Sequence, residues 1–103
     1  MPVTYPVIFT QAARRELIEA QDWYEREVTG VGRRFREATD ALVRRMSQNP
    51  LQFPVVFKHV RRALLRPLPY SLFFVIEQDA SLPAAIRRTG KGEHEALRKH
   101  KVW

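Results

Sequence analysis

Three arginines, Arg61, Arg62 and Arg66, are the side chains of this sequence best suited to chemistry, and that chemistry is the binding of anions. They lie between Ala41 and Ile76, a stretch that contains no acidic residue. Guanidinium groups form paired hydrogen bonds with phosphates and carboxylates, so this stretch favours a nucleic acid or an acidic protein as partner. The alternative interpretation is that these charges only protect a sheet edge from aggregation.

Other kinds of reactive group are scarce. The sequence has no cysteine, which excludes disulfides, thiolate metal ligands and a thiol nucleophile and favours a reducing cytoplasm. His59, His94 and His100 lack the spacing of metal ligands. The glycines at 30 and 32 suit a turn between helices better than a phosphate-binding loop. We therefore expect no metal and no cofactor, with a net charge of +7 available for binding.

The elements that would position the arginines follow from the hydrophobic pattern. Val3–Phe9 alternates and is rich in β-branched and aromatic residues, which predicts a strand, and Pro6 favours an edge position for it. Apolar residues three or four apart predict one helix from about Ala13 to Val28 and a second that carries Phe35 to Met46 inward. Two glycines separate them, which predicts an αα-hairpin.

Two strands are predicted after the hairpin, over Val60–Leu65 and Tyr70–Glu77, with a turn at Arg66–Pro69. Phe53–Phe57 is an apolar segment that leads into them. Side chains alternate between the faces of a strand, and both faces of the second strand are mostly apolar. If one face lies on the helices, the other is an apolar surface that we expect a partner protein to cover.

The chain of 103 residues is expected to form one domain. We divide it into a folded part, residues 1–80, and a C-terminal tail of the same domain, residues 81–103. The start of the sequence lacks the pattern of a secretory signal, and the apolar run Leu72–Ile76 is too short to span a bilayer. These features predict a cytoplasmic protein that does not contact a membrane.

From residue 3 to residue 79 the sequence resembles the ParE/RelE superfamily of toxins from type II toxin–antitoxin modules, and its ParE branch, the plasmid stabilization proteins, most closely. The residues that carry the resemblance, in chain order, are Val7–Phe9, Ala12-Ala13, Glu16-Leu17, Glu19-Ala20, Trp23-Tyr24-Glu25, Gly30-Val31-Gly32, Phe35, Asn49-Pro50, Phe53-Pro54, Arg61-Arg62-Ala63-Leu64-Leu65 and Pro69-Tyr70. The resemblance implies an α+β fold with the order β-α-α-β-β(-β), in which a helical hairpin packs on a small antiparallel sheet.

The resemblance also implies a function and partners. The ParE branch poisons DNA gyrase and is neutralised by a ParD-like antitoxin, which alone contacts operator DNA. The RelE branch cuts messenger RNA in the ribosome and carries basic residues on the open face of strands two and three. The corresponding positions here are Arg62, Leu64 and Ser71, of which only Arg62 is charged. Phosphate cleavage needs several cations to stabilise its transition state, so the resemblance predicts a gyrase inhibitor without catalytic residues.

Two alternatives remain open at this point, a RelE-like ribosome-dependent messenger RNA endonuclease and an inactive remnant that only binds antitoxin. Candidate residues can still be named for the preferred interpretation. The candidates for contact with the target share a positive charge and are Arg61, Arg62 and Arg66. The candidates for contact with the antitoxin share the open face of the sheet and are Leu64, Ser71, Phe73 and Val75.

The tail from Leu82 to Trp103 departs from the family pattern. The family closes with a fourth apolar strand, whereas Pro83 interrupts the corresponding run here, so we expect a weak strand at best. One explanation is a change of reading frame after about Ser81, which the coding DNA would reveal. The other is a divergent tail that contacts a partner. Either explanation puts activity carried by the family C-terminus in doubt.

Overall fold

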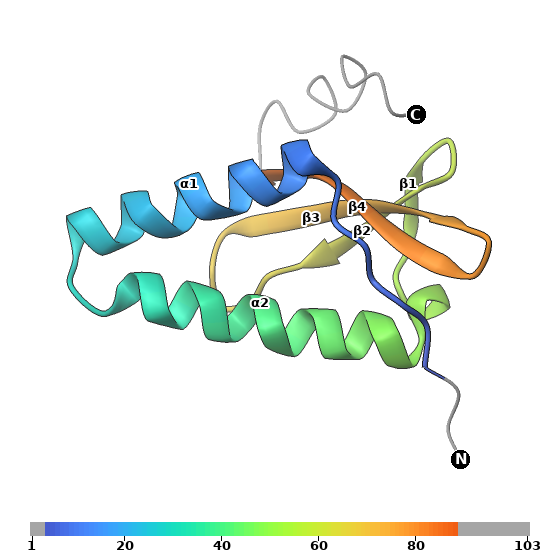
Figure 1. Cartoon of the computed structure of the whole chain (residues 1–103), viewed down its shortest axis with the longest axis horizontal. Helices are drawn as coiled ribbons and strands as arrows, with labels where there is room; N and C mark the ends of the chain where they lie inside the picture. The colour runs from blue at the N-terminus through green and yellow to red at the C-terminus, as the bar shows by residue number, and fades with distance from the viewer. Residues whose placement is uncertain (1–3, 89–103) are drawn as a thin grey trace.

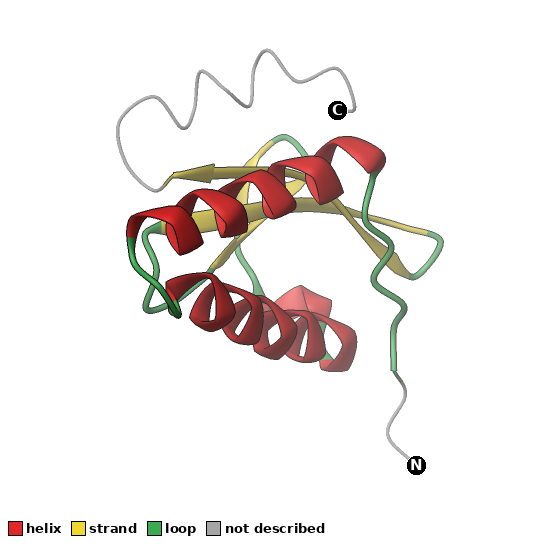
Figure 2. Cartoon of the chain, turned by 60° about the vertical axis from the view of Figure 1, so that its left-hand side comes forward, coloured by secondary structure: helices red, strands yellow, loops and turns green. Residues whose placement is uncertain are grey.

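The computed structural model describes residues 4–88 and shows two helices packed on a four-stranded antiparallel sheet (Figures 1 and 2). The strand order in the sheet is β1-β2-β3-β4, so each strand pairs with its neighbour in the sequence. This confirms the predicted α+β class. The elements in chain order are α1 (Gln11–Glu27), α2 (Val31–Gln48), a 3₁₀ turn η1 (Pro50–Gln52), β1 (Val55–Phe57), β2 (Val60–Leu64), β3 (Tyr70–Glu77) and β4 (Ala80–Arg88).

The main core lies between the helical hairpin and one face of the sheet. Phe35 of α2 is a fully buried aromatic side chain of this core, and the rings of Tyr24 from α1 and Tyr70 from β3 lie 5.8 and 5.5 Å from it, centroid to centroid. The other buried members of this cluster are Ala20, Leu42, Met46, Phe53, Ala63, Leu65, Leu72, Phe74 and Ile86. Within the described residues, neither helix has the length and apolar character needed to cross a membrane.

The two helices are joined by a turn that the Glu25 side chain holds in place. The carboxylate of Glu25, in the last turns of α1, accepts hydrogen bonds of 3.1 Å from the backbone N–H groups of Gly30 and Gly32. Gly30 has a φ of 92°, a conformation that favours glycine. Because the first N–H groups of a helix lack partners within it, Glu25 serves as the cap of α2.

Replacing Glu25 by alanine should therefore lower the free energy of unfolding by about 1 kcal/mol, the usual cost of losing a helix cap. Glu27→Ala is the matched control, because Glu27 is an exposed glutamate at the end of the same helix, and the N–H groups of Gly30 and Gly32 donate to Glu25 instead. Urea unfolding of both variants measures the difference. Equal losses of stability in the two variants would contradict a capping role for Glu25.

The N-terminal segment is not the regular strand that the sequence predicted. Within residues 4–10 the structure shows one isolated parallel bridge, between Val7 and Ser81 of β4. The N–H of Ile8 donates to the carbonyl of Ser81 over 2.8 Å, and the N–H of Ser81 donates to that of Pro6 over 2.9 Å. Pro6 offers no N–H, so the pairing stays short. The segment still lies along the outer edge of β4 (Figure 1).

The prediction of a weak strand at Leu82–Ile86 is wrong, because Ala80–Arg88 forms β4 and pairs with β3 along its length. The carbonyl of Pro83 accepts a hydrogen bond from the N–H of Thr10, so this residue's polar groups face away from β3. Since the N–H and C=O of one strand residue point the same way, the N–H that proline lacks would not have bonded β3. A bulge at Phe73 and Phe74 then shifts the register.

The remaining outward part of β4 is held by α1. The N–H of Ile86 donates to the carboxylate of Glu16 over 3.2 Å, a contact between residues far apart in the sequence. The N-terminal segment and Glu16 together satisfy outward-facing backbone groups of this edge strand, which would otherwise be open to pairing with another chain. Both features fix β4, and through it β3, against the helices.

Candidate functional site

The candidate site is the face of β2 and β3 that points away from the main core. Arg62 is opposite Phe73 and Leu64 is opposite Ser71 in the β2–β3 ladder. Because opposed residues in a ladder share a face, these four side chains lie on one side of the sheet. The structure therefore brings together three positions singled out from the sequence for comparison with RNA-cutting toxins, Arg62, Leu64 and Ser71.

Arg61 points to the other face of the sheet. It is opposite Phe74, a member of the main core, and its Nη1 donates a 2.6 Å hydrogen bond to the backbone carbonyl of Phe53. This bond ties β2 to the segment that precedes β1. Arg66 lies beyond the end of β2 and is exposed. The three arginines proposed as target contacts thus do not form one patch, because neighbouring strand residues alternate between faces.

Arg62 is the cation among these four residues of β2 and β3, and it is only partly exposed. Its Nε atom is buried, and its strand neighbour across the ladder is the fully buried Phe73. An arginine side chain keeps its positive charge in a protein, so Arg62 makes this part of the face positive.

The expectation that this face would be an uncovered apolar surface is wrong. Phe73 and Ser71 are both 0% exposed. Phe73 forms a second core cluster with Val60 and Ala85, which lie on the neighbouring strands β2 and β4. The partly buried side chains that pack against this cluster are Val56, Phe57 and Val75. The short β1–β2 hairpin therefore contributes to a small core of its own on this side of the sheet.

Among the four residues proposed to contact the antitoxin, Leu64 and Val75 are partly exposed. These two can contact a partner directly, whereas Ser71 and Phe73 support them from within. Arg62 and Leu64 are the exposed part of the same row on β2. On β2 and β3, the partly exposed side chains of this face therefore form a mixed strip of Arg62, Leu64 and Val75.

The described residues of the site can be compared with what metal-assisted and phosphate-cleaving chemistry requires. Within residues 4–88, no group of three or more His, Asp or Glu side chains is placed to hold a metal ion. Leu64 and Ser71, opposite each other, carry no charge that could stabilise a phosphate-centred transition state. What the arrangement supports is binding through shape and charge.

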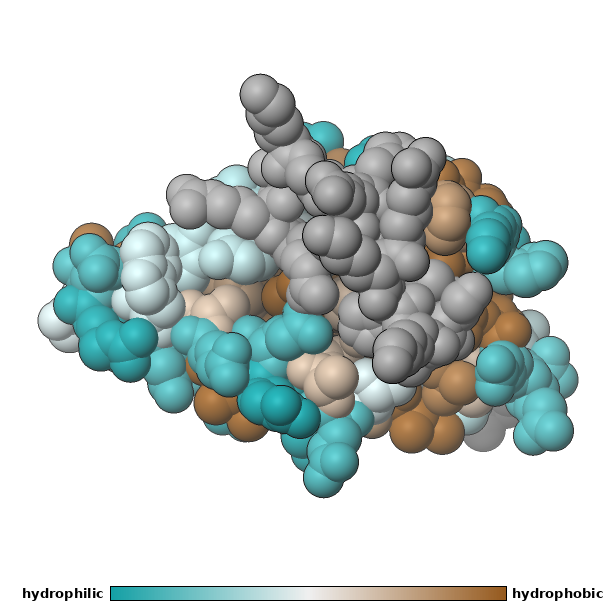
Figure 3. All heavy atoms as spheres, turned by 90° about the horizontal axis from the view of Figure 1, so that it is seen from above, coloured by the Kyte–Doolittle hydropathy of each residue, from teal (hydrophilic) through white to brown (hydrophobic). Residues whose placement is uncertain are grey.

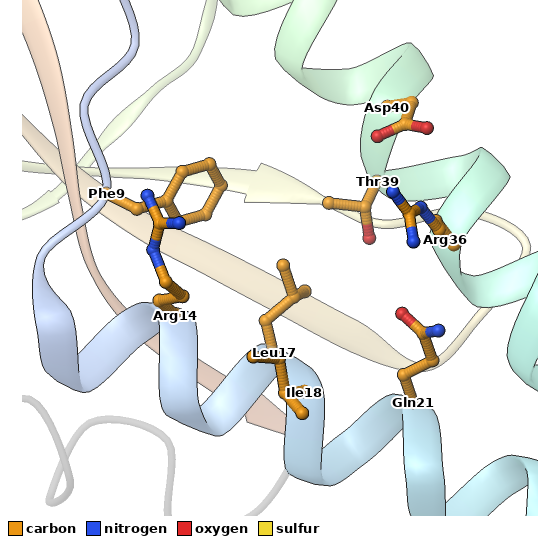
Figure 4. A pocket seen from close by; sticks show the side chains of 8 residues that line it. All are labelled: Phe9, Arg14, Leu17, Ile18, Gln21, Arg36, Thr39 and Asp40. Carbon is orange, nitrogen blue, oxygen red and sulfur yellow. The ribbon is translucent and has the colours of Figure 1, made fainter.

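A second feature was missed in the sequence, a groove between α1 and α2 (Figure 4). It has a volume of about 330 Å³, and Leu17 and Ile18 of α1 lie at its middle. In the sequence, this groove is indicated by Ile18, an apolar residue that follows Leu17 and lies beside the inward-facing apolar stripe of the helix. The face seen in Figure 3 mixes hydrophilic and hydrophobic side chains, with hydrophilic ones dominant at its left end, where the hairpin turns.

Comparisons with known proteins agree with this architecture. The model of the family described as the ParE toxin of type II toxin–antitoxin system, parDE, matches residues 7–94, and so extends past residue 80 into the segment expected to diverge. No curated protein matches the chain significantly.

Two solved structures share the fold. The first, the chromosomal ParDE TA system from P. aeruginosa, superposes with a TM-score of 0.73 at 19% identity and covers 84% of this chain and 98% of that chain. The second, the toxin–antitoxin complex RelBE2 from Mycobacterium tuberculosis, has a TM-score of 0.60 at 20% identity and covers 85% and 94%.

Proposed function

Because the chain belongs to the family of ParE toxins of type II toxin–antitoxin systems, we propose that it inhibits DNA gyrase by binding it and that a ParD-like antitoxin neutralises it. In this proposal the protein acts in the cytoplasm and is not an enzyme. It reaches operator DNA only through the antitoxin.

The observation that carries the non-enzymatic proposal is the pairing of Leu64 with Ser71 beside Arg62. A ribonuclease of this fold would need several cations there, each contributing about 3 kcal/mol to transition-state stabilisation. Here one cation is present at the three positions. A RelE-like ribonuclease is therefore the less supported alternative, although a RelBE2 complex shares the fold.

The exposure of each candidate residue decides which partner contact we propose for it. Leu64 and Val75 contact the antitoxin, with Ser71 and Phe73 packed beneath them. Arg66, exposed beyond β2, and the charged end of Arg62 contact the target, while Arg61 supports them by holding the carbonyl of Phe53. The two sets of residues adjoin on β2, so antitoxin bound over Leu64 would also obstruct the target contacts.

Expression of this chain alone in bacteria should stop growth, and co-expression of the neighbouring antitoxin gene should restore it. The reason is that a free toxin occupies its target, whereas the complex has its contact surface covered. Colony counts after induction measure the effect. The control is a strain that expresses both genes, with soluble protein confirmed in each case. Normal growth at confirmed soluble expression would remove the toxin proposal and leave an antitoxin-binding remnant.

A further inference from the structure

The groove between α1 and α2 has an apolar floor that is open to solvent. Phe9, Leu17 and Ile18 form this floor, and Ile18 is 52% exposed. Figure 4 shows Leu17 rising from α1 between the side chains of Phe9 and Gln21, with Ile18 beside it on the same helix. An inserted aliphatic side chain would bury apolar surface here, which favours binding. The floor lies on the helical side of the molecule, away from the strip formed by Arg62, Leu64 and Val75.

The rim of the groove carries two cations, one from each helix. Arg14 comes from α1 and Arg36 from α2, and both are exposed. Neither side chain forms an ion pair or hydrogen bond with any residue in the described range, 4–88. By contrast, Arg33 on the same helix bonds Glu37 over 3.2 Å. The two rim arginines are thus available to carboxylates from outside the chain.

The other polar groups of the groove limit what can bind. The hydroxyl of Thr39 already donates to the carbonyl of Phe35 over 2.9 Å. Asp40 also lines the rim, one helical turn after Arg36, without an ion pair to a described residue. The rim therefore has two positive charges against one negative charge, and the chain as a whole carries +7. Such a rim favours an occupant with more acidic than basic groups.

We propose that this groove binds an acidic segment of the antitoxin, which inserts one aliphatic side chain over Leu17 and Ile18 and presents carboxylates to Arg14 and Arg36. The inference rests on the proposed function, because it takes the antitoxin as the partner. A groove of about 330 Å³ between two helices suits one or two side chains of an extended or helical peptide. It adds a contact on the helical hairpin to the one proposed on the sheet.

The test is the affinity of the antitoxin encoded beside this chain, measured by titration calorimetry against purified variants. Arg14→Glu and Arg36→Glu should each raise Kd about tenfold or more, since they place like charges opposite the proposed carboxylates. Arg15→Glu and Arg34→Glu are matched controls, because they change the same charge on the same helices outside the groove. These controls should change Kd less than about threefold.

The apolar floor is tested in the same way. Ile18→Asn should raise Kd about tenfold by removing the aliphatic contact, whereas Val28→Asn, at a similarly exposed apolar position outside the groove, should not. Far-ultraviolet circular dichroism of each variant confirms that the fold is retained. Ile18 and the arginines are surface residues, so their substitution leaves the core intact.

The outcomes separate this inference from the proposed function. Tight binding by the wild type with Kd unchanged in Arg14→Glu, Arg36→Glu and Ile18→Asn would overturn the groove proposal and leave the toxin proposal standing. No binding by the wild type would overturn both. If the free chain were instead a dimer that these variants dissociate, a second copy would be the occupant, which also overturns the proposal.

Discussion

Replacing Phe35 by alanine is expected to lower the free energy of unfolding by about 3 to 5 kcal/mol, the cost of removing a large side chain from a packed core. Phe35 is 0% exposed. Its ring contacts Tyr24 of α1 and Tyr70 of β3, so one side chain of α2 connects both helices to the sheet. Since a domain of this size has about 5 to 15 kcal/mol in total, the variant should be barely folded.

The matched control is Phe57→Ala. Phe57 lies on the short edge strand β1 and is only partly buried, next to the second cluster. Its loss should cost about 1 to 2 kcal/mol, because less apolar surface is buried there. Urea unfolding followed by circular dichroism measures both variants. An equal cost at the two positions would mean that the main core is not centred on Phe35.

The helical hairpin and β3 were predictable because their signals are local. Apolar spacing of three and four located α1 and α2, and alternation located Tyr70–Glu77, whose observed bounds are the same. The β1 strand was missed as a strand, because Val55–Phe57 is short and is defined by its pairing with β2.

The errors concern contacts between distant segments. Pro83 was expected to weaken a strand because proline lacks an N–H. The strand accommodates it because the Pro83 carbonyl faces away from β3 and accepts a hydrogen bond from the N–H of Thr10, a residue far away in the sequence. Alternation placed Ser71 and Phe73 correctly on one face of β3, yet it carried no information about what packs over that face. The groove likewise depends on how α1 and α2 are arranged in space, which a single-helix pattern does not specify. Candidate positions could therefore be named from the sequence, but their exposure could not.

The second large effect is expected on DNA gyrase, which should lose its supercoiling activity when this protein is added without antitoxin. We expect inhibition by binding rather than by cleavage because, of the positions Arg62, Leu64 and Ser71 on the face of β2 and β3, only Arg62 is charged. Adding the antitoxin first should preserve supercoiling, because the bound antitoxin covers Leu64 and Val75 next to the target contacts.

The same assay tests the proposed target contacts. Arg66→Glu should raise the concentration needed for half-inhibition about tenfold, since it reverses a charge at the proposed interface. Arg26→Glu makes the same change at an exposed position near the end of α1 and should leave inhibition unaltered. Equal effects of the two variants would show that overall charge, rather than contact at Arg66, determines inhibition.

The most direct test of the central claim is a purified gyrase supercoiling assay run beside a ribosome-dependent translation assay, each with and without this protein. The account predicts that supercoiling is lost while translation continues and the messenger RNA stays uncut. Intact supercoiling with cleaved messenger RNA would contradict it and would show that the uncharged residues Leu64 and Ser71 do not prevent a RelE-like reaction.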